Sequence, residues 1–156
     1  MADYLLYWKY YWRDVHILGP GMVTSDWHTS NERIFDQLRT GDNLWVVIQG
    51  GDSGQDEWRL LERICIGKLE QDVDEERYEV NEYGRFHVIG DPTRSDVFDP
   101  VDQPDFTPLL LKLTFSTGRK ITSSGRLIGQ SLQTARKLSD ADTDMLKAYS
   151  AKLILM

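Results

Sequence analysis

The chain has 156 residues, of which 40% are hydrophobic and 28% charged, with a single cysteine. This composition predicts one globular domain over residues 1–156 and excludes a disordered chain. No hydrophobic run approaches the roughly 18 residues of a membrane span, and the first residues lack a secretory pattern. Cys65 has no second cysteine with which to form a disulfide or a cysteine zinc site. We therefore expect a cytoplasmic protein that does not enter membranes.

Charge is distributed unevenly along the chain, whose formal net charge is −7. Residues 106–139 contain six basic side chains and no acid, whereas residues 70–105 are strongly acidic. A negative net charge disfavours nucleic-acid binding, because phosphate neutralisation supplies much of its affinity. The basic segment still permits a local cationic face; the alternative is that both segments are solvated and partly neutralise each other.

The first predicted elements are a strand and a helix. The aromatic run from Tyr4 to Trp12 has no helical period and predicts a strand buried on both faces. Thr29 followed by Glu32 matches a capping box, so a helix is expected to begin there and to end near Gly41, where glycine accepts a left-handed conformation.

Two core strands are predicted next. The apolar run 44–48 predicts a strand that ends in a glycine-rich turn. Residues 57–68 predict a long strand with one inward face, because four apolar residues share one parity: Trp58, Leu60, Ile64 and Ile66.

The acidic segment is predicted to be mostly loop, with a short strand over 85–89 and a crossing loop over 91–108 that holds four prolines. Alternating leucines predict a strand over 109–115. The last element is a helix capped by Ser139, with Asp142 in its first turn and an inner stripe of Leu146, Tyr149 and Leu153. Together these elements predict an α+β, mainly β domain: a small barrel of about five to six strands with two or more short helices.

Several catalytic and metal chemistries are disfavoured. The segment 51–54, Gly-Asp-Ser-Gly, resembles the nucleophile motif of chymotrypsin-like proteases, but the chain is too short for their double barrel and turn chemistry explains the residues. The three histidines lack metal-ligand spacing, the acids of 72–76 lack the rest of a calcium loop, and no phosphate-binding glycine pattern occurs. No cofactor, metal or catalytic residue is therefore predicted.

The supply of tryptophan is high, with five in the chain. Trp45 and Trp58 fall inside strands and are predicted to be core. Trp12 and Trp27 fall at predicted barrel rims, where their rings could stack on a planar ligand while polar neighbours read its edge. The predicted ligand-binding set is Trp12, Trp27, His28, Ser30, Asn31 and Gln49. The alternative is that both rim tryptophans only pack the helix against the sheet.

The order of motifs resembles the EVE domain of the PUA-like superfamily. The resemblance lies in the run 27–33 (Trp-His-Thr-Ser-Asn-Glu-Arg), the turn 38–42 (Leu-Arg-Thr-Gly-Asp) and the strand 44–48. Tyr7-Trp8 matches the opening strand motif and 64–67 a later one. At the C-terminal end, 125–127 (Gly-Arg-Leu) and 136–139 (Arg-Lys-Leu-Ser) resemble the closing stretch.

This resemblance implies a pseudo-barrel of about five strands and a pocket for a nucleobase, often modified, flipped out of DNA or RNA. Trp27 and Asn31 match the tryptophan and asparagine at the family's helix start. Gln49 departs from the family, which has an aromatic and a small polar residue there, and the acidic charge balance is a second departure.

Three functions are weighed. The preferred one is a nucleic-acid-binding module for a modified base, with phosphates held by Arg119, Lys120, Arg126 and Arg136. The second is a small amidohydrolase acting on acylated nucleosides, as the resemblance to the superfamily implies, with Lys9 or Lys120 beside a threonine and a glutamate. The third is an accessory domain that binds a protein partner through the acidic segment 70–105.

Overall fold

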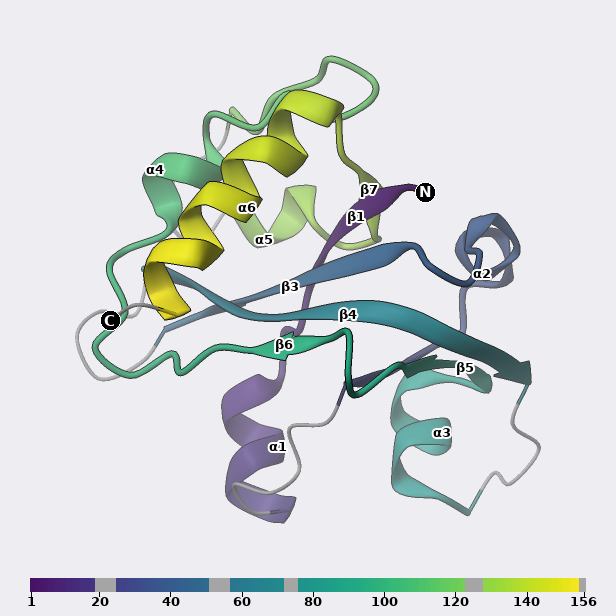
Figure 1. Cartoon of the computed structure of the whole chain (residues 1–156). Helices are drawn as coiled ribbons and strands as arrows, with labels where there is room; N and C mark the ends of the chain where they lie inside the picture. Colours follow the sequence, from purple (N-terminus) through teal and green to yellow (C-terminus); the bar gives the residue numbers. More distant parts are fainter. Residues whose placement is uncertain (19–24, 51–56, 72–75, 123–127, 155–156) are drawn as a thin grey trace.

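The computed structural model describes residues 1–18, 25–50, 57–71, 76–122 and 128–154. Within these ranges the chain forms one seven-stranded sheet and several short helices (Figure 1). The elements in chain order are β1 (Asp3–Tyr7), α1 (Tyr11–Leu18), β2 (Asp26–Thr29), α2 (Glu32–Gln37), β3 (Asn43–Gln49), β4 (Trp58–Gln71), α3 (Tyr78–Tyr83), β5 (Phe86–Gly90), β6 (Asp96–Val97), α4 (Thr107–Leu110), α5 (Ile128–Ser131), β7 (Arg136–Lys137) and α6 (Asp140–Ile154).

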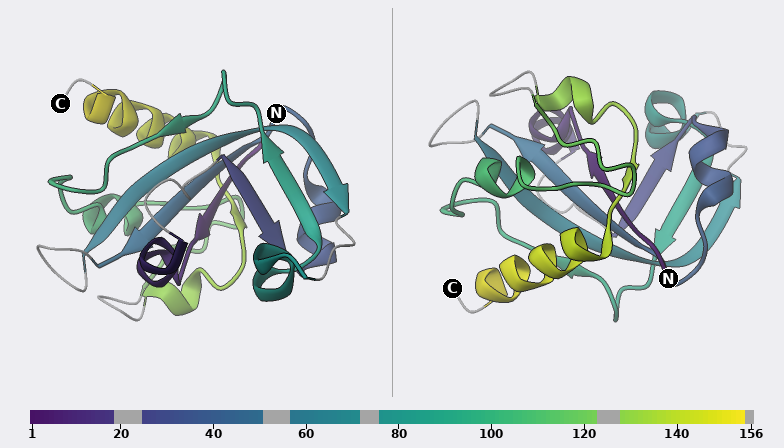
Figure 2. Two further views of the ribbon diagram at one scale, coloured as in Figure 1. Left: turned by 90° about the horizontal axis from the view of Figure 1, so that it is seen from below. Right: turned by 90° about the horizontal axis from the view of Figure 1, so that it is seen from above.

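The sheet is open and largely antiparallel, with the strand order β2-β5-β4-β3-β1-β7 and β6 paired to β4. Only β1 and β3 pair in parallel in the described part of the chain. The sheet is curved, and β2 and β5 turn away from the direction of β1 and β3 (Figure 2). A mixed α+β, β-rich fold is therefore confirmed, whereas the closed pseudo-barrel remains a prediction. None of the helices in the described ranges is long and apolar enough to cross a bilayer.

Strand β3 is buried on both faces, which is why it reads as a continuous apolar run. Trp45 and Val47 point into one core, which we call the upper core because it lies beneath α4, α5 and α6 in Figure 1. Leu44, Val46 and Ile48 point into the lower core on the opposite face. The upper core is completed by Leu5, Trp58, Leu60, Phe98, Phe106, Leu110, Leu113, Phe115, Ile121, Ile128, Leu132, Leu138 and Leu146. The lower core is completed by Tyr4, Leu6, Tyr11, Leu38, Leu61, Ile64, Ile66, Val88 and Ala135.

Strand β4 changes face at a β-bulge. Val47 pairs with Leu60 but Val46 pairs with Glu62, so Leu61 is the extra residue on β4. As a result Leu60 belongs to the upper core and Ile64 to the lower core, although they share one parity. The predicted single inward face over 57–68 is therefore wrong: Trp58 and Leu60 face the upper core, whereas Ile64 and Ile66 face the lower core.

The predicted strand over 4–12 is wrong beyond residue 7. The last ladder bond runs from the Trp8 N–H to the Val47 carbonyl, and α1 then begins at Tyr11. Aromatic side chains that favour a strand locally are here held by tertiary contacts: the Tyr11 ring packs edge-on against the Trp8 ring, with centroids 5.1 Å apart. Tyr11 and Val15, four residues apart, face the lower core.

The predicted strand over 109–115 is also wrong. Pro108 stands in the first turn of α4, and the buried residues that follow Phe106 are Leu110 and Leu113, at the spacing of a helix rather than a strand. Leu111, at the alternating position, is exposed. Burial, and not the alternation of leucines, decides the conformation here.

Other expectations hold with adjusted ends. The strands predicted over 44–48 and 85–89 are β3 and β5, and Trp45 and Trp58 are fully buried. The last helix is α6, where Ser139 and Asp142 cap each other through hydrogen bonds of 3.0 and 3.2 Å. The helix after β2 is capped by Asn31 rather than Thr29, and α3 is a helix within the segment predicted to be loop and strand.

Candidate functional site

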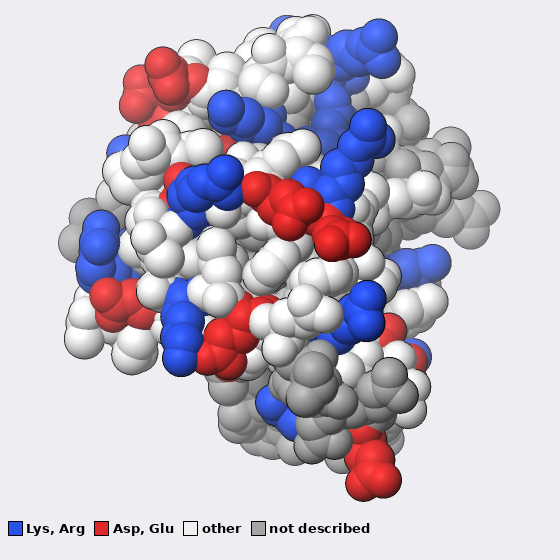
Figure 3. All heavy atoms as spheres, turned by 90° about the vertical axis from the view of Figure 1, so that its right-hand side faces the viewer, with Lys and Arg blue, Asp and Glu red and all other residues white. Residues whose placement is uncertain are grey.

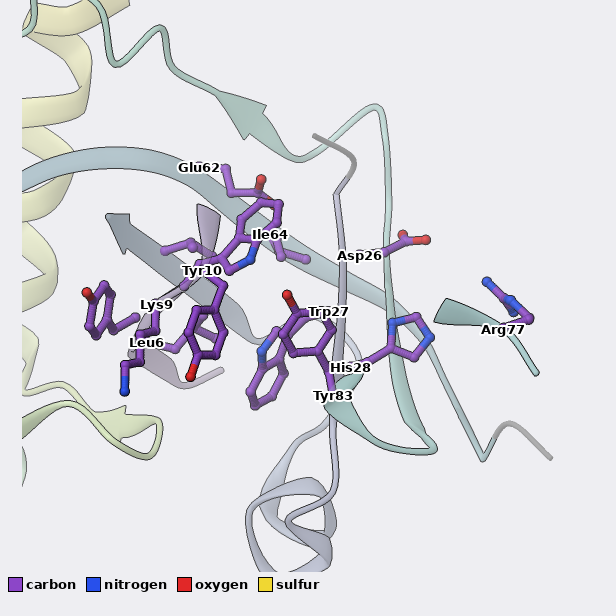
Figure 4. Close-up of a pocket in the computed structure, with 13 residues that line it drawn as sticks. Leu6, Lys9, Tyr10, Asp26, Trp27, His28, Glu62, Ile64, Arg77 and Tyr83 are labelled. Carbon is purple, nitrogen blue, oxygen red and sulfur yellow. The ribbon is translucent and has the colours of Figure 1, made fainter. Parts of the chain in front are cut away.

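A cavity of about 470 Å³ opens on the lower face of the sheet, within the size range of small-molecule sites (Figure 4). It lies between the end of β1, the strands β3 and β4, the strand β2 and the helix α3. Its lining combines aromatic, aliphatic and charged side chains: Leu6, Tyr7, Trp8, Lys9, Tyr10, Asp26, Trp27, His28, Val46, Glu62, Ile64, Arg77 and Tyr83.

Large aromatic rings from three parts of the chain border this cavity. Trp8 and Tyr10 follow β1, Trp27 lies on β2 and Tyr83 ends α3. Tyr10 is 43% exposed, whereas Trp27 is half-buried and also packs against the lower core. The pocket therefore offers ring faces both at its mouth and deeper inside.

A buried carboxylate fixes two of these rings. Asp14 has no exposed side-chain surface, and it accepts a hydrogen bond of 2.7 Å from the Trp8 indole and another from the Tyr83 hydroxyl. Tyr78 and Arg13 donate to the same carboxylate at 2.9 and 3.0 Å. Although burial opposes ionisation, these hydrogen bonds hold the pKa of Asp14 below its ordinary value. Asp14 thus ties α1 to α3 and holds the wall of the pocket in place.

Glu62 is the most unusual group in the pocket. It is 2% exposed, and neither carboxyl oxygen has a hydrogen-bond partner in the described part of the chain. Burial, with a smaller contribution from the charge of Asp26, raises the pKa of Glu62 from 4.5 to about 8. The bulge at Leu61 puts this side chain on the pocket face together with Ile64. Glu62 is therefore mostly uncharged at neutral pH, and it lines the cavity with two buried carboxyl oxygens that have no hydrogen-bond partner among the described residues.

Two histidines lie at the β2 side of the pocket. His28 and His87 face each other across the β2–β5 pair, with stacked rings 3.9 Å apart. The His87 ring nitrogen lies 3.4 Å from the Asp26 carboxylate. Only His28 of this pair lines the cavity among the residues described, and no three His, Cys, Asp or Glu side chains there form a metal site.

Of the predicted ligand-binding residues, Trp27 and His28 line this pocket. Asn31 caps α2 by accepting from the Ile34 N–H at 3.1 Å, and it borders a separate depression of about 70 Å³ that Trp27 also touches. Ser30 borders another hollow beside α3. In the described structure Asn31 and Ser30 do not contribute to the main pocket.

Trp12 and Gln49 are brought together, but away from the main pocket. The Trp12 indole donates to the Gln49 carbonyl at 2.9 Å, and Trp12 is 40% exposed on α1. Trp12 and Trp27 therefore do not enclose one common cavity among the described residues. The other tryptophan among the residues that line the pocket is Trp8.

Three of the four predicted phosphate-binding residues lie on the other face of the sheet: Arg119, Lys120 and Arg136. Arg136 donates to the Arg119 carbonyl at 2.7 Å, and its guanidinium lies 3.7 Å from the ring of Phe115 in the upper core. Arg119 and Lys120 are exposed in the same region, and Arg126 lies outside the described residues. The cations that border the pocket are instead Lys9 and Arg77.

Charge on the side of the molecule that carries α2 and α3 is mixed. Lysine and arginine side chains alternate there with aspartate and glutamate, without a continuous basic area (Figure 3).

Sequence analysis missed Trp8, Tyr10, Glu62 and Tyr83 as pocket residues. For Glu62 a signal existed: it shares the parity of Leu60 and Ile64 within a buried strand, and a carboxylate at such a position needs a reason. The comparisons with known proteins add no family, since no protein-family model and no curated protein matches this chain.

Proposed function

We propose that the pocket binds a nucleobase, including a modified one, presented by DNA or RNA, and that the protein is a binding module. The observation that carries the proposal is a cavity of about 470 Å³ that combines several aromatic rings with a buried carboxyl whose oxygens have no hydrogen-bond partner in the described part of the chain. We also propose that the curved sheet is a variant of the EVE pseudo-barrel that the sequence motifs resemble.

Stacking and edge recognition supply the binding free energy in this proposal. Each base stacked on an aromatic ring contributes about 1–3 kcal/mol. Extruding a base from a duplex costs a few kcal/mol, which one or two stacked rings and hydrogen bonds to Glu62 offset. Trp8 is already oriented by Asp14, so little side-chain entropy is lost on binding.

Phosphates on either side of the bound base are assigned to Lys9 and Arg77, which border the same cavity. Two phosphate contacts on a single strand give a slope of about −1.4 in log affinity against log salt. This weak dependence fits an acidic protein better than the larger basic set predicted from the sequence.

Fluorescence anisotropy with a dye-labelled, single-stranded RNA or DNA dodecamer at two salt concentrations tests the proposal. We expect Trp27→Ala to weaken binding by about 10- to 100-fold, which corresponds to the loss of one stacked base. Trp12→Ala is the matched control, because it removes the same ring outside the pocket, and it should change affinity less than about 3-fold. Tyr10→Ala, at an exposed position, tests the pocket without disturbing the core.

Equal effects of Trp27→Ala and Trp12→Ala would contradict the proposal, and so would the absence of binding to any oligonucleotide. Circular dichroism of each variant establishes that the fold is retained before affinities are compared.

An amidohydrolase acting on acylated nucleosides is the second candidate, because Lys9 and Glu62 border one cavity. A nucleophilic lysine needs desolvation, however, and Lys9 is exposed. No threonine lines the described part of this pocket. Binding without catalysis therefore has more support; release of acetate from acetylated cytidine would favour the enzyme instead.

A further inference from the structure

We propose that Glu62 makes the pocket selective for positively charged, N-methylated nucleobases over their neutral isomers. This inference rests on the proposed function and deepens it by naming the chemical class of the base. Methylation of a ring nitrogen, as in 1-methyladenine or 3-methylcytosine, leaves a delocalised positive charge next to an exocyclic amino group that donates hydrogen bonds.

Glu62 has no hydrogen-bond partner for its carboxyl group among the described residues. Buried carboxylates in proteins are paired with a cation or with several donors, because an unpaired buried charge is costly. Asp14, buried to the same extent on the same side of the sheet, has donors on both oxygens. Glu62 has none in the described residues, although Lys9 and Arg77 border the same cavity. An N-methylated, positively charged base carries both a hydrogen-bond donor and a positive charge, which are the two features that a partner of Glu62 needs.

Glu62 shares its cavity with several aromatic rings. The face of an indole or phenol ring attracts cations, and Trp8, Tyr10, Trp27 and Tyr83 surround the cavity. A cationic ring stacked on these faces gains both stacking and cation–π attraction. A neutral ring of the same shape gains the stacking alone.

A further argument is electrostatic. Asp26 lies on β2 at the same cavity, and its charge acts on Glu62 in the direction that disfavours a second negative charge. Tyr11 of α1 also interacts with Glu62. The other titratable or charged groups at the cavity are Tyr7, Lys9, Tyr10, His28, Arg77 and Tyr83. A bound cation relieves the repulsion between the two carboxyl groups, so Glu62 loses its proton when the ligand binds. A neutral base brings no such relief.

Isothermal titration calorimetry at neutral pH with two isomeric nucleotides tests this selectivity. The probes are 1-methyladenosine 5′-monophosphate, whose base is cationic, and N6-methyladenosine 5′-monophosphate, whose methyl group is on the exocyclic nitrogen of a neutral base. We expect the wild-type protein to bind the cationic isomer at least tenfold more tightly. Glu62→Gln keeps the size of the side chain but cannot ionise, and it should reduce the ratio of the two affinities to about twofold or less.

The outcomes separate the two proposals. If both isomers bind equally, or if Glu62→Gln keeps the preference, the inference about Glu62 is wrong while the nucleobase pocket stands. If neither isomer binds and no oligonucleotide binds in a manner that depends on Trp27, the proposed function itself fails. A peptide carrying trimethyl-lysine forms the third arm: its binding in place of both nucleotides would overturn the inference in favour of a methylated protein partner.

Discussion

Replacing Glu62 by glutamine is expected to change the pH dependence of stability in a defined direction. The pKa of Glu62 is raised in the folded protein, from 4.5 to about 8, so the folded state holds a proton that the unfolded state releases between these values. Stability of the wild-type protein therefore falls as pH rises from about 4.5 to about 8 through this group, and it is unaffected by the group above and below that window.

The size of the effect follows from the same two values. At about 1.4 kcal/mol per pH unit, the interval corresponds to roughly 5 kcal/mol. Between pH 5 and pH 8 the protein crosses most but not all of this interval, so we expect a change of about 3 kcal/mol in the free energy of unfolding. Glutamine fits the same space and carries no titratable proton, so Glu62→Gln should gain stability relative to wild type as pH rises.

Urea unfolding of both proteins at about pH 5, 6.5 and 8, followed by tryptophan fluorescence, measures this difference. Every other titratable group is common to both proteins, so its contribution cancels in the comparison. A stability difference that is the same at all three pH values would refute the reasoning, because it would mean that Glu62 is ionised in the folded protein at pH 5 as it is at pH 8.

Three further changes test the framework around the pocket. Asp14→Asn should lower the free energy of unfolding by about 3 kcal/mol at neutral pH, because charge-assisted hydrogen bonds from four donors are weakened. Since the pKa of Asp14 is lowered in the folded state, this difference should shrink as pH falls below 3.8. A difference that stays constant with pH would argue against an ionised carboxylate at this position. Gly84→Ala should cost about 3 kcal/mol of stability in thermal unfolding, because φ is +116° and the added Cβ would lie 2.2 Å from a backbone nitrogen. Gly118→Ala, at φ +75° with open space around the added Cβ, should cost about 1 kcal/mol. Similar losses for the two variants would contradict the close contact at Gly84. Asp142→Ala should cost about 3 kcal/mol by urea unfolding, because it leaves three backbone N–H groups without their acceptor, and a loss below about 1 kcal/mol would mean that water replaces the carboxylate.

Local patterns predicted the elements whose signals are local. The apolar run of β3 and the Ser139–Asp142 cap of α6 are both read correctly, since each depends on neighbours in sequence. The start of α1 could not be read in this way. Its aromatic residues favour a strand, and the structure overrides that preference through the Asp14 contacts to Tyr78 and Tyr83, more than 60 residues away.

The pocket was only partly predictable for the same reason. Trp27 and His28 were found because an aromatic residue before a helix suggests a rim position. Trp8 and Glu62 are not predicted, because their places depend on where β1 ends and on the extra residue Leu61 in β4. Phase changes of this kind leave no mark in hydrophobic periodicity, which assumes an unbroken strand.

The extra residue at Leu61 also protects the sheet against mispairing. Were β4 to slide by one position and form an unbroken ladder with β3, either Trp58 and Leu60 or Glu62 and Ile64 would have to exchange sides. In the first case the upper core beneath α6 loses the side chains of Trp58 and Leu60. In the second case the carboxyl group of Glu62 enters that core. Both shifted arrangements are less stable than the native one. Strand β4 therefore keeps one register against β3, although both faces of the sheet are covered.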